Sequence, residues 1–314
     1  MTTRKAHNPK ETKVALLMGG WNTEREVSLS SGKAMLESLQ RQGYQVKALD
    51  LTHNLEELLH FLTPKPDIVF NGLHGMYVED GRLQGILDIL EIPYTHSGAR
   101  ASAIAMHKPT AKVFFELAGI PCAKGGVFNW DDIQDRHPMH TPYVIKPLDE
   151  GSSVGVHIIH EEDGPINNRL SWSFQKEVLV EEYIPGYELS CVVMGDKSLG
   201  VIELRAKQGF YDYRAKYTDG VTDHIFPAPV PKPVYDNIMD YALKAHKIIG
   251  CAGVSRSDFR YDPKTGRVCI LEINTQPGCT TLSIVPDVAS HVGISFDKLV
   301  SWLIEDGLCQ GLRR

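Results

Sequence analysis

The chain has 314 residues, of which 42% are hydrophobic and 23% are charged, and acidic residues outnumber basic ones by 39 to 33. This length predicts about two domains, and this composition excludes a largely disordered or fibrous chain. The formal charge of −6 argues against a general nucleic-acid-binding protein, which needs a basic face.

The sequence carries no clear targeting signal and no cysteine motif. No apolar run approaches the ~18 residues of a membrane-spanning helix, so we expect no membrane span. Residues 1–12 are charged and lack the apolar segment of a secretory signal, and we expect a disordered lead-in there. The six cysteines are scattered without a Cys-x-x-Cys pair, which indicates neither a zinc ribbon nor a disulfide framework. We therefore expect a reduced, cytoplasmic protein.

The first hundred residues alternate between strand and helix patterns. Short apolar runs predict buried strands at 13–18, 45–49, 67–73 and 92–96. Helical patterns lie between them, one ending at Gly43 and the others spanning 55–62 and 82–90. This alternation predicts a mostly parallel sheet, whose ligands collect at the carboxyl ends of the strands. The turns at those ends, 19–25 and 73–81, are rich in glycine and polar residues.

The pattern changes after Gly98. Helices are predicted at 99–106, 110–118 and 233–249. Strands are predicted at 143–146, 156–159, 178–183, 188–194, 200–204, 254–261 and 268–274. Between them, residues 206–227 form a long polar and aromatic stretch, of a length that is typical of functional lids or disordered loops.

A glycine-serine loop follows the strand predicted at 143–146. Gly151 and Gly155 flank Ser152 and Ser153, so that backbone amides and hydroxyls can approach an anion closely. Lys146, at the end of the strand, adds a cation. These features predict a phosphate-binding loop, and a plain hairpin turn is the alternative for this segment alone.

Charged residues alternate on the strand predicted at 254–261. Arg256, Asp258 and Arg260 share one face of it, and Glu272 and Asn274 share a face of the next strand. Such oxygen ligands suit Mg²⁺, and Arg256 could stabilise nearby charge. The two strands present these groups together only if their turn holds an odd number of residues or a bulge. A solvated face of charge pairs is the alternative, which the flanking apolar runs disfavour because buried unpaired carboxylates are costly.

Two further features have an ordinary structural alternative. The stretch 209–217 (GFYDYRAKY) could be a lid that excludes water from a reactive intermediate, or a strand with alternating aromatic residues. Glu24 and His74 stand where a parallel sheet exposes its strand ends, but a helix-capping charge and a hydrogen-bonded core histidine are the alternatives.

Seven segments in this order resemble the D-alanine–D-alanine ligases of the ATP-grasp superfamily. They are 18–32 (MGGWNTEREVSLSSG), 71–85 (NGLHGMYVEDGRLQG), 107–112 (HKPTAK), 144–156 (VIKPLDEGSSVGV), 210–217 (FYDYRAKY), 253–259 (GVSRSDF) and 271–286 (LEINTQPGCTTLSIVP). The resemblance implies an α/β fold of three subdomains, with ATP between two antiparallel sheets. These subdomains are an N-terminal substrate-binding one at 13–97, a central one at 98–186 and a C-terminal catalytic one at 187–314.

The resemblance also implies a reaction and a nucleotide site. One D-alanine carboxylate attacks the γ-phosphate of ATP, and the amine of a second D-alanine attacks the resulting acyl phosphate, which gives D-alanyl-D-alanine for peptidoglycan. The ATP phosphates would be contacted by Lys108, Lys146 and Ser153. The adenine and ribose would be held by Glu181, Tyr183, Ile184 and Glu188. Two Mg²⁺ (or Mn²⁺) ions would be bound by Asp258, Glu272 and Asn274.

By the same resemblance, the remaining residues serve the amino-acid substrates. Arg256 and the amide of Gly278 would form the oxyanion site, and Lys216 would reach the transferred phosphate. The first D-alanine would lie at Glu24 and His74, with Ser152 and Tyr217 bonded to Glu24. The carboxylate of the second D-alanine would be received by Ser283 and Ile284. Family members commonly pair through their N-terminal regions, which implies a homodimer.

This sequence departs from the family pattern at two positions beside the site. Val78 replaces a usual glycine before Glu-Asp-Gly, and Leu282 replaces a common histidine before Ser283. Tyr217, rather than phenylalanine, resembles the enzymes that join two D-alanines instead of making a D-lactate ester. The alternatives are another ATP-grasp carboxylate–amine ligase with a different substrate, and a nucleotide-binding regulatory module without turnover.

Overall fold

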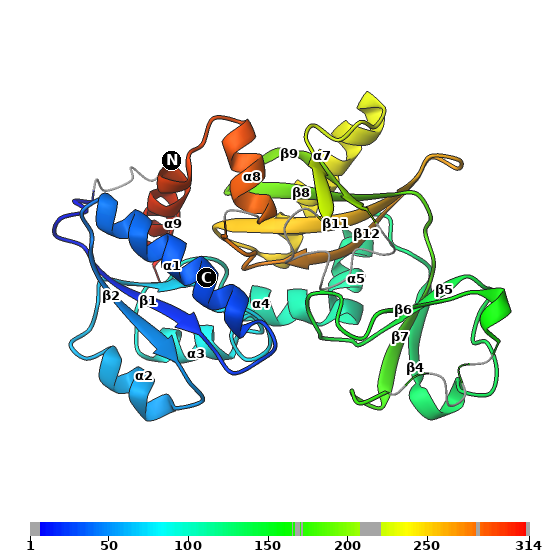
Figure 1. The fold of residues 1–314 in the computed structure, drawn as a ribbon, viewed down its shortest axis with the longest axis horizontal. Helices are drawn as coiled ribbons and strands as arrows, with labels where there is room; N and C mark the ends of the chain where they lie inside the picture. The colour runs from blue at the N-terminus through cyan, green and yellow to red at the C-terminus, as the bar shows by residue number, and fades with distance from the viewer. Residues whose placement is uncertain are drawn as a thin grey trace.

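The computed structural model describes residues 7–164, 166, 170, 172–207, 221–280 and 283–311. Three β-sheets organise these residues, a parallel sheet near the N-terminus and two antiparallel sheets (Figure 1). Residues 7–12 form a turn in which Thr12 bonds to Asn8 and Gln45, so the expected disordered lead-in does not hold for this part of it. None of the described helices has the length and apolar character needed to cross a membrane.

The N-terminal sheet has the strand order β2-β1-β3, and neighbouring strands run parallel. Its strands are β1 (Lys13–Gly19), β2 (Gln45–Leu51) and β3 (Ile68–Asn71). They are followed in turn by α1 (Arg25–Arg41), α2 (Leu55–Phe61) and α3 (Arg82–Ile89). The strand expected at 92–96 is reduced to a single bridge from Tyr94 to Val69, because Pro93 has no amide to donate.

A four-stranded antiparallel sheet of order β4-β7-β5-β6 forms the second unit. Its strands are β4 (Gly125–Asn129), β5 (Tyr143–Lys146), β6 (His157–Ile159) and β7 (Glu177–Glu182). Helices α4 (Ala99–Met106) and α5 (Lys108–Leu117) precede it, and its loops contain the short 3₁₀ turns Trp130–Asp132 and Glu161–Asp163. The edge strand β4 was not predicted, because its sequence opens on two glycines.

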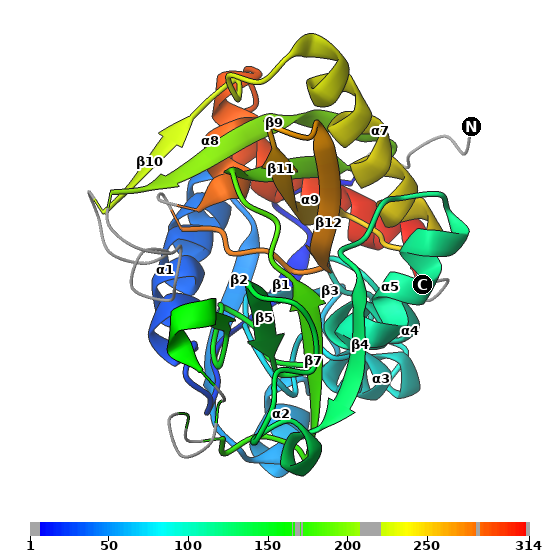
Figure 2. The ribbon, with the colours of Figure 1, turned by 90° about the vertical axis from the view of Figure 1, so that its right-hand side faces the viewer.

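A five-stranded antiparallel sheet of order β10-β9-β8-β11-β12 forms the third unit. Its strands are β8 (Tyr187–Met194), β9 (Lys197–Ala206), β10 (Thr222–Ile225), β11 (Val254–Asp262) and β12 (Arg267–Asn274). Its helices are α7 (Lys232–Ile249), α8 (Ile284–His291) and α9 (Phe296–Gln310). In Figure 2 this sheet and the four-stranded sheet are separate layers, joined by the chain between β7 and β8.

The hydrophobic cores divide the chain differently from the subdomain boundaries expected at 98 and 187. One core joins β1, β3 and α1 to β8, β9, α8 and α9. A second core joins α4 and α5 to α7, β8, β11 and β12, although both helices belong to the expected central segment. The four-stranded sheet keeps a core of its own. The boundaries themselves stay a prediction, and the packing shows that the four-stranded sheet is the most separate unit.

Strands β11 and β12 contain the irregularity that the sequence required. Asp258 lies directly opposite Glu272 and Arg256 opposite Asn274, but Phe259 pairs with Ile270, so the register shifts between Asp258 and Phe259. Directly opposed residues of an antiparallel pair point to the same side of the sheet. The bulge therefore brings the two carboxylates to one face, as predicted.

Candidate active site

Two adjoining cavities lie where the three units meet. The first has about 690 Å³ of empty space, part of it open to solvent, between the loops of the parallel sheet, α4, the loop 150–152 and strand β12. The second has about 800 Å³, also partly open to solvent, between the two antiparallel sheets. Lys108, Glu150 and Glu272 line both cavities, so the two cavities are direct neighbours.

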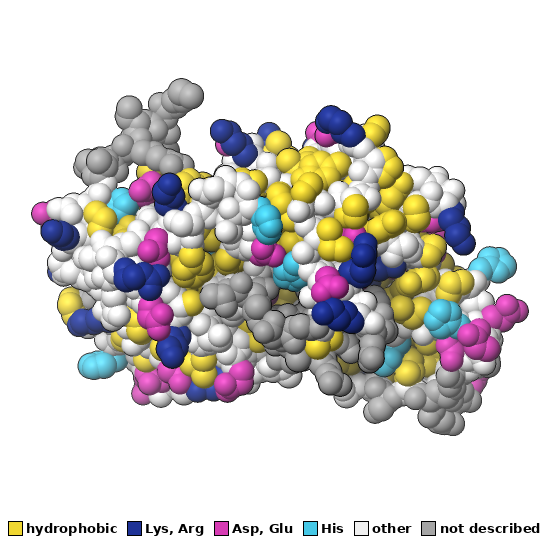
Figure 3. All heavy atoms as spheres, turned by 45° about the horizontal axis from the view of Figure 1, so that its top comes forward, with side chains coloured by type: hydrophobic (Ala, Val, Ile, Leu, Met, Phe, Trp, Pro, Cys, Tyr) yellow, Lys and Arg dark blue, Asp and Glu magenta, His cyan; other side chains and the backbone are white. Residues whose placement is uncertain are grey.

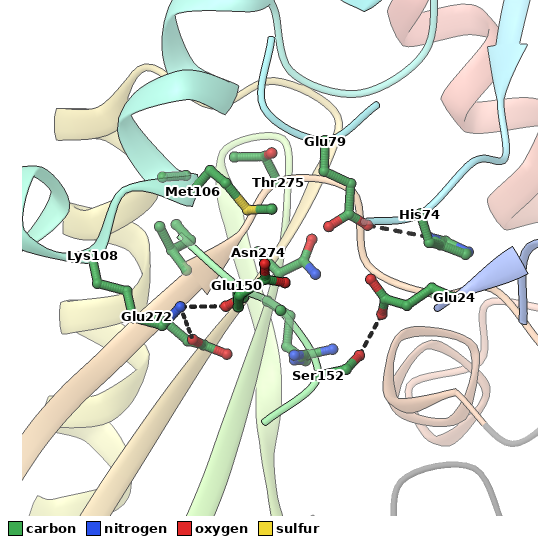
Figure 4. A pocket seen from close by; sticks show the side chains of 15 residues that line it. Glu24, His74, Glu79, Met106, Lys108, Glu150, Ser152, Glu272, Asn274 and Thr275 are labelled. Carbon is green, nitrogen blue, oxygen red and sulfur yellow. Dashed lines mark hydrogen bonds and ion pairs between the residues drawn. The ribbon is translucent and has the colours of Figure 1, made fainter. Parts of the chain in front are cut away.

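Glu24 lies at one end of the first cavity and is held from three sides. It is the residue before α1, and its amide donates to the Asn22 side chain at 2.9 Å. The Ser152 hydroxyl donates to its carboxylate, across 128 residues of sequence (Figure 4). Gly75 has φ +85°, and a Cβ there would lie 2.6 Å from Glu24 Oε2, so only glycine lets this turn approach the carboxylate. The predicted contact between Ser152 and Glu24 is thus present.

His74 lies beside Glu24 in a buried hydrogen-bonded group. Its Nδ1 is 3.2 Å from Glu79 Oε1, and its Nε2 is 3.3 Å from the Ser31 hydroxyl. Burial lowers the pKa of His74, but the hydrogen bond and charge of Glu79, together with the charge of Glu24, outweigh it and raise the pKa. Burial raises the pKa of Glu79, and the Glu24 charge adds to this. The carboxylates at this end of the cavity therefore attract a cation such as an ammonium group.

The opposite end of the first cavity carries the polar face of β11 and β12. Arg256 donates from Nε and Nη2 to Asp258 at 2.8–3.2 Å, and the Ser190 hydroxyl donates to the same carboxylate at 2.6 Å. Lys108 lies 3.7 Å from Glu272 (Figure 4). The first cavity thus has Glu24 and Glu79 at one end, and at the other end the cations Arg256 and Lys108, which are paired with the carboxylates of Asp258 and Glu272.

The second cavity contains a buried carboxylate between two lysines. Glu181 is 4% exposed, and both Lys112 and Lys146 form ion pairs with it. Burial by itself raises the pKa of Glu181, but the two lysine charges and hydrogen bonds outweigh it and lower the pKa. Glu181 is therefore ionised and can accept hydrogen bonds inside the cavity.

The rest of the second cavity combines an apolar wall with the glycine-serine loop. Tyr183, Ile184 and Glu188 line one side, where the chain passes from one antiparallel sheet to the other. Ser153 lines the other side. Ser152 and Ser153 have φ +49° and +60°, a strained conformation that is typical of loops built around a ligand.

Comparison with known proteins identifies the family. Residues 117–305 match a family model described as D-ala D-ala ligase C-terminus. A D-alanine–D-alanine ligase of Xanthobacter autotrophicus is 50% identical over 300 residues, which are 93% of this chain and 97% of that protein. The chain belongs to the D-alanine–D-alanine ligase family.

Solved structures of the D-alanine–D-alanine ligase family have the same fold. The ligase of Bacillus anthracis matches with a TM-score of 0.81 at 31% identity, covering 95% of this chain and 98% of that one. The same ligase complexed with ATP matches with a TM-score of 0.78 at 28% identity, covering 95% and 97%. These matches confirm the predicted family and its α/β ATP-grasp fold, and this family member is an enzyme.

The structure places the expected oxyanion residues and second-substrate residues close together. Arg256 and Gly278 line the first cavity. Ser283 is the residue before α8, its hydroxyl accepts from the Thr280 amide at 2.9 Å, and a Cβ on Gly278 would lie 3.0 Å from that hydroxyl. Ile284 is buried in the core beside α9. Ser283 and Ile284 thus lie behind the cavity wall at Gly278.

Three positions named from the sequence, Lys216, Tyr217 and Leu282, lie outside the described residues. Val78 lies within the described residues. Val78 is buried in the core of the parallel sheet, and its carbonyl accepts from the Gln84 side chain at 2.9 Å. The turn after His74 therefore still delivers Glu79 to the cavity.

Sequence reasoning missed four charged residues that line the two cavities, Glu79, Glu150, Glu182 and Arg260. It also missed Lys112, which pairs with Glu181. Glu79 and Lys112 lie inside quoted family segments, and Glu150 begins the glycine-serine loop, so their position in these motifs was the available signal. Arg260 shares a strand face with Asp258, which was noticed without a role being assigned.

Proposed function

We propose that this enzyme joins two D-alanine molecules to D-alanyl-D-alanine at the expense of ATP, for peptidoglycan precursor synthesis in the cytoplasm. The supporting observation is the pair of adjoining cavities that share Lys108, Glu150 and Glu272. An amino acid whose ammonium lies at Glu24 turns its carboxylate toward the phosphate end of a nucleotide in the second cavity. The names of the relatives supply the identity of the amino acid and of the nucleotide.

The first step is phosphoryl transfer to a carboxylate. An oxygen of the first D-alanine carboxylate attacks the γ-phosphorus of ATP, the bond to the β-phosphate oxygen breaks, and ADP leaves. Lys108, Lys146 and Ser153 hold the phosphates, and Lys216 reaches the transferred group. Two anions must approach each other here, and fixed cations reduce the repulsion between them. The product is D-alanyl phosphate.

The second step is attack on the acyl phosphate. The free amine of the second D-alanine, whose carboxylate lies at Ser283 and Ile284, attacks the carbonyl carbon. Arg256 and the Gly278 amide stabilise the oxyanion, and the departing phosphate takes the proton that the amine loses. Ser152 and Tyr217 hold Glu24 in place, and Glu24 together with His74 orients the first D-alanine. Water must be excluded from the site because water would hydrolyse the acyl phosphate.

Two carboxylates and an amide oxygen fit a magnesium-nucleotide site. Asp258 and Glu272 face each other on β11 and β12, and Asn274 follows on the same face. The described residues contain no group of three or more His, Cys, Asp or Glu side chains that could by themselves hold a metal ion. Asp258, Glu272 and Asn274 would hold two Mg²⁺ or Mn²⁺ ions, which neutralise phosphate charge when bound.

The nucleotide base and the assembly complete the proposal. Glu181 accepts from the adenine amino group, Glu188 from the ribose hydroxyls, and Tyr183 and Ile184 line the base. The enzyme is a homodimer with no nucleic-acid partner. On the face drawn in Figure 3, acidic and basic side chains are interspersed rather than gathered into one basic patch.

The decisive experiment measures phosphate release from ATP with D-alanine, L-alanine and D-lactate. We expect release with D-alanine and formation of the dipeptide. Release with L-alanine alone would instead support another carboxylate–amine ligase. Absence of release, with nucleotide still bound, would support a regulatory module.

The metal role of Glu272 is tested by Glu272→Gln, with Glu177→Gln at the exposed first residue of β7 as the control. We expect the first change to abolish turnover without lowering the melting temperature by more than a few degrees, and the control to be neutral. Near-normal kcat in Glu272→Gln would refute the metal role.

A further inference from the structure

Arg260 is a partly buried cation of the second cavity whose role the reaction leaves open. It lies on β11 directly opposite Glu188 on β8, and its Nη1 donates to Glu188 Oε2 at 3.2 Å. The two side chains are 11% and 14% exposed. An arginine is desolvated to this degree only where its donors find partners, so its contacts indicate what it holds in place.

Most of these partners belong to the segment that links the two antiparallel sheets. The Arg260 Nε donates to the Ile184 carbonyl at 3.0 Å, and Nη2 donates to the Gly186 carbonyl at 3.0 Å and to the Tyr183 hydroxyl at 3.4 Å. The guanidinium also lies 5.6 Å from the centre of the Tyr183 ring. One side chain of the five-stranded sheet thus binds the linker 183–186 at three residues.

The backbone of the linker also packs closely against the backbone of β11. Gly186 has φ +97°, and a Cβ there would lie 2.3 Å from the Tyr261 carbonyl oxygen. This contact places the linker carbonyls within reach of the guanidinium. The same linker carries Tyr183 and Ile184, and Glu188 follows it closely. Arg260 therefore contacts three of the four residues assigned to the base and ribose, and Glu181 is the fourth.

We propose that Arg260 is a positioning residue for the nucleotide, which fixes the linker 183–186 and aims the Glu188 carboxylate at the ribose. The inference rests on the proposed function, in which the second cavity holds ATP. The planar fork of arginine is required, because a lysine ammonium is a single point that cannot bond two carbonyls and a carboxylate in fixed directions. Arg260 does not touch the reacting atoms, so it acts on nucleotide affinity rather than on the chemical step.

The test compares ADP with 2′-deoxyADP, since only ADP offers both hydroxyls to Glu188. Binding constants are measured by calorimetry for the wild-type enzyme, Arg260→Met and Arg260→Lys. We expect ADP affinity to fall about tenfold in Arg260→Met, the loss expected for one hydrogen bond to a charged group, and 2′-deoxyADP affinity to fall less. The preference for ADP over 2′-deoxyADP therefore shrinks in Arg260→Met, and Arg260→Lys restores little of this preference. The KM for D-alanine stays unchanged in both variants.

Two further variants separate positioning from a general effect on folding. Arg205→Lys alters an arginine–glutamate pair on β9 of the same sheet, outside the second cavity, and should leave both binding constants unchanged. Glu188→Gln should remove the same preference as Arg260→Met, and the double variant should show no additional loss of it. Where Arg260→Met fails to fold, Arg260→Lys combined with Glu188→Gln provides the same comparison.

The outcomes distinguish this inference from the proposed function. If Arg260→Met weakens the binding of ADP and 2′-deoxyADP equally, or weakens neither, the positioning role is overturned. The ligase function still stands in that case, provided that the enzyme releases phosphate in the presence of D-alanine. If the wild-type enzyme binds ADP no more tightly than 2′-deoxyADP, the proposal that Glu188 bonds to the ribose is wrong. A wild-type enzyme that neither binds ADP nor releases phosphate overturns both proposals.

Discussion

His246 gives the sharpest prediction about stability. It lies on α7, is 4% exposed, and its Nδ1 is 2.7 Å from the hydroxyl of Ser255 on β11. This contact joins the helix to the strand that carries Arg256 and Asp258. Burial, with a smaller contribution from the charge of Lys247, lowers the pKa of His246 from 6.5 to about 4. The folded protein therefore holds this imidazole neutral at a pH where an exposed histidine is protonated.

The sign and size of the effect follow from proton linkage. Between pH 6.5 and about 4 the unfolded chain binds a proton at His246 that the folded chain does not, so the free energy of unfolding falls as the pH falls through this window. At about 1.4 kcal/mol per pKa unit, the difference corresponds to a loss of about 3 kcal/mol. Above pH 6.5 both states are neutral at this position, and the contribution of His246 no longer changes with pH.

The assay is urea unfolding of the wild type and of His246→Asn at a series of pH values from 4 to 7.5. The asparagine amide can take over the hydrogen bond to Ser255 but does not titrate. We expect the variant to lose about 3 kcal/mol less stability over this range than the wild type. His60→Asn, at an exposed histidine of α2, is the matched control and should keep the wild-type pH dependence. Parallel curves for the wild type and His246→Asn would refute the reasoning.

Two further predictions concern the cavities. Ser152→Ala removes the hydroxyl that donates to Glu24, and we expect the KM for the first D-alanine to rise about tenfold while nucleotide affinity stays constant; an unchanged KM would show that this hydroxyl does not orient Glu24. Lys112→Met leaves the buried Glu181 with one lysine, and we expect a loss of about 3 kcal/mol in unfolding free energy and weaker ADP binding. Lys244→Met, in an exposed pair with Asp240, is its control, and equal effects of the two changes would contradict the importance of burial.

Local patterns predicted most strands and helices, and they even predicted a geometric condition on the site. Alternation placed Asp258 on one strand face and Glu272 on another, and only a bulge or an odd turn could bring the faces together. The register shift after Asp258 meets this condition. The reasoning succeeded because side-chain direction in a strand has a period of two, which any reader of the sequence can count.

Packing between distant segments could not be read in the same way. Helices α4 and α5 have ordinary helical patterns, which show an apolar face but not the partner of that face, and this partner is α7 with the five-stranded sheet. The subdomain boundaries expected from the resemblance therefore differ from the boundaries of the cores. Edge strand β4 escaped prediction for the opposite reason, since its glycines leave too little pattern to detect.

The active site shows the same limit in its chemistry. Glu24 and Ser152 are 128 residues apart, and nothing in either local sequence indicates that they touch; only the family resemblance joined them. Glu79 and Lys112 were overlooked because each serves a neighbour, His74 and Glu181, rather than a substrate. A buried charge requires a partner of opposite charge, so each buried charged residue predicted from the sequence implies a partner that the local sequence does not identify. Searching each family segment for an unassigned residue of opposite charge would have found both, and extending the search one residue beyond the segment 253–259 draws attention to Arg260.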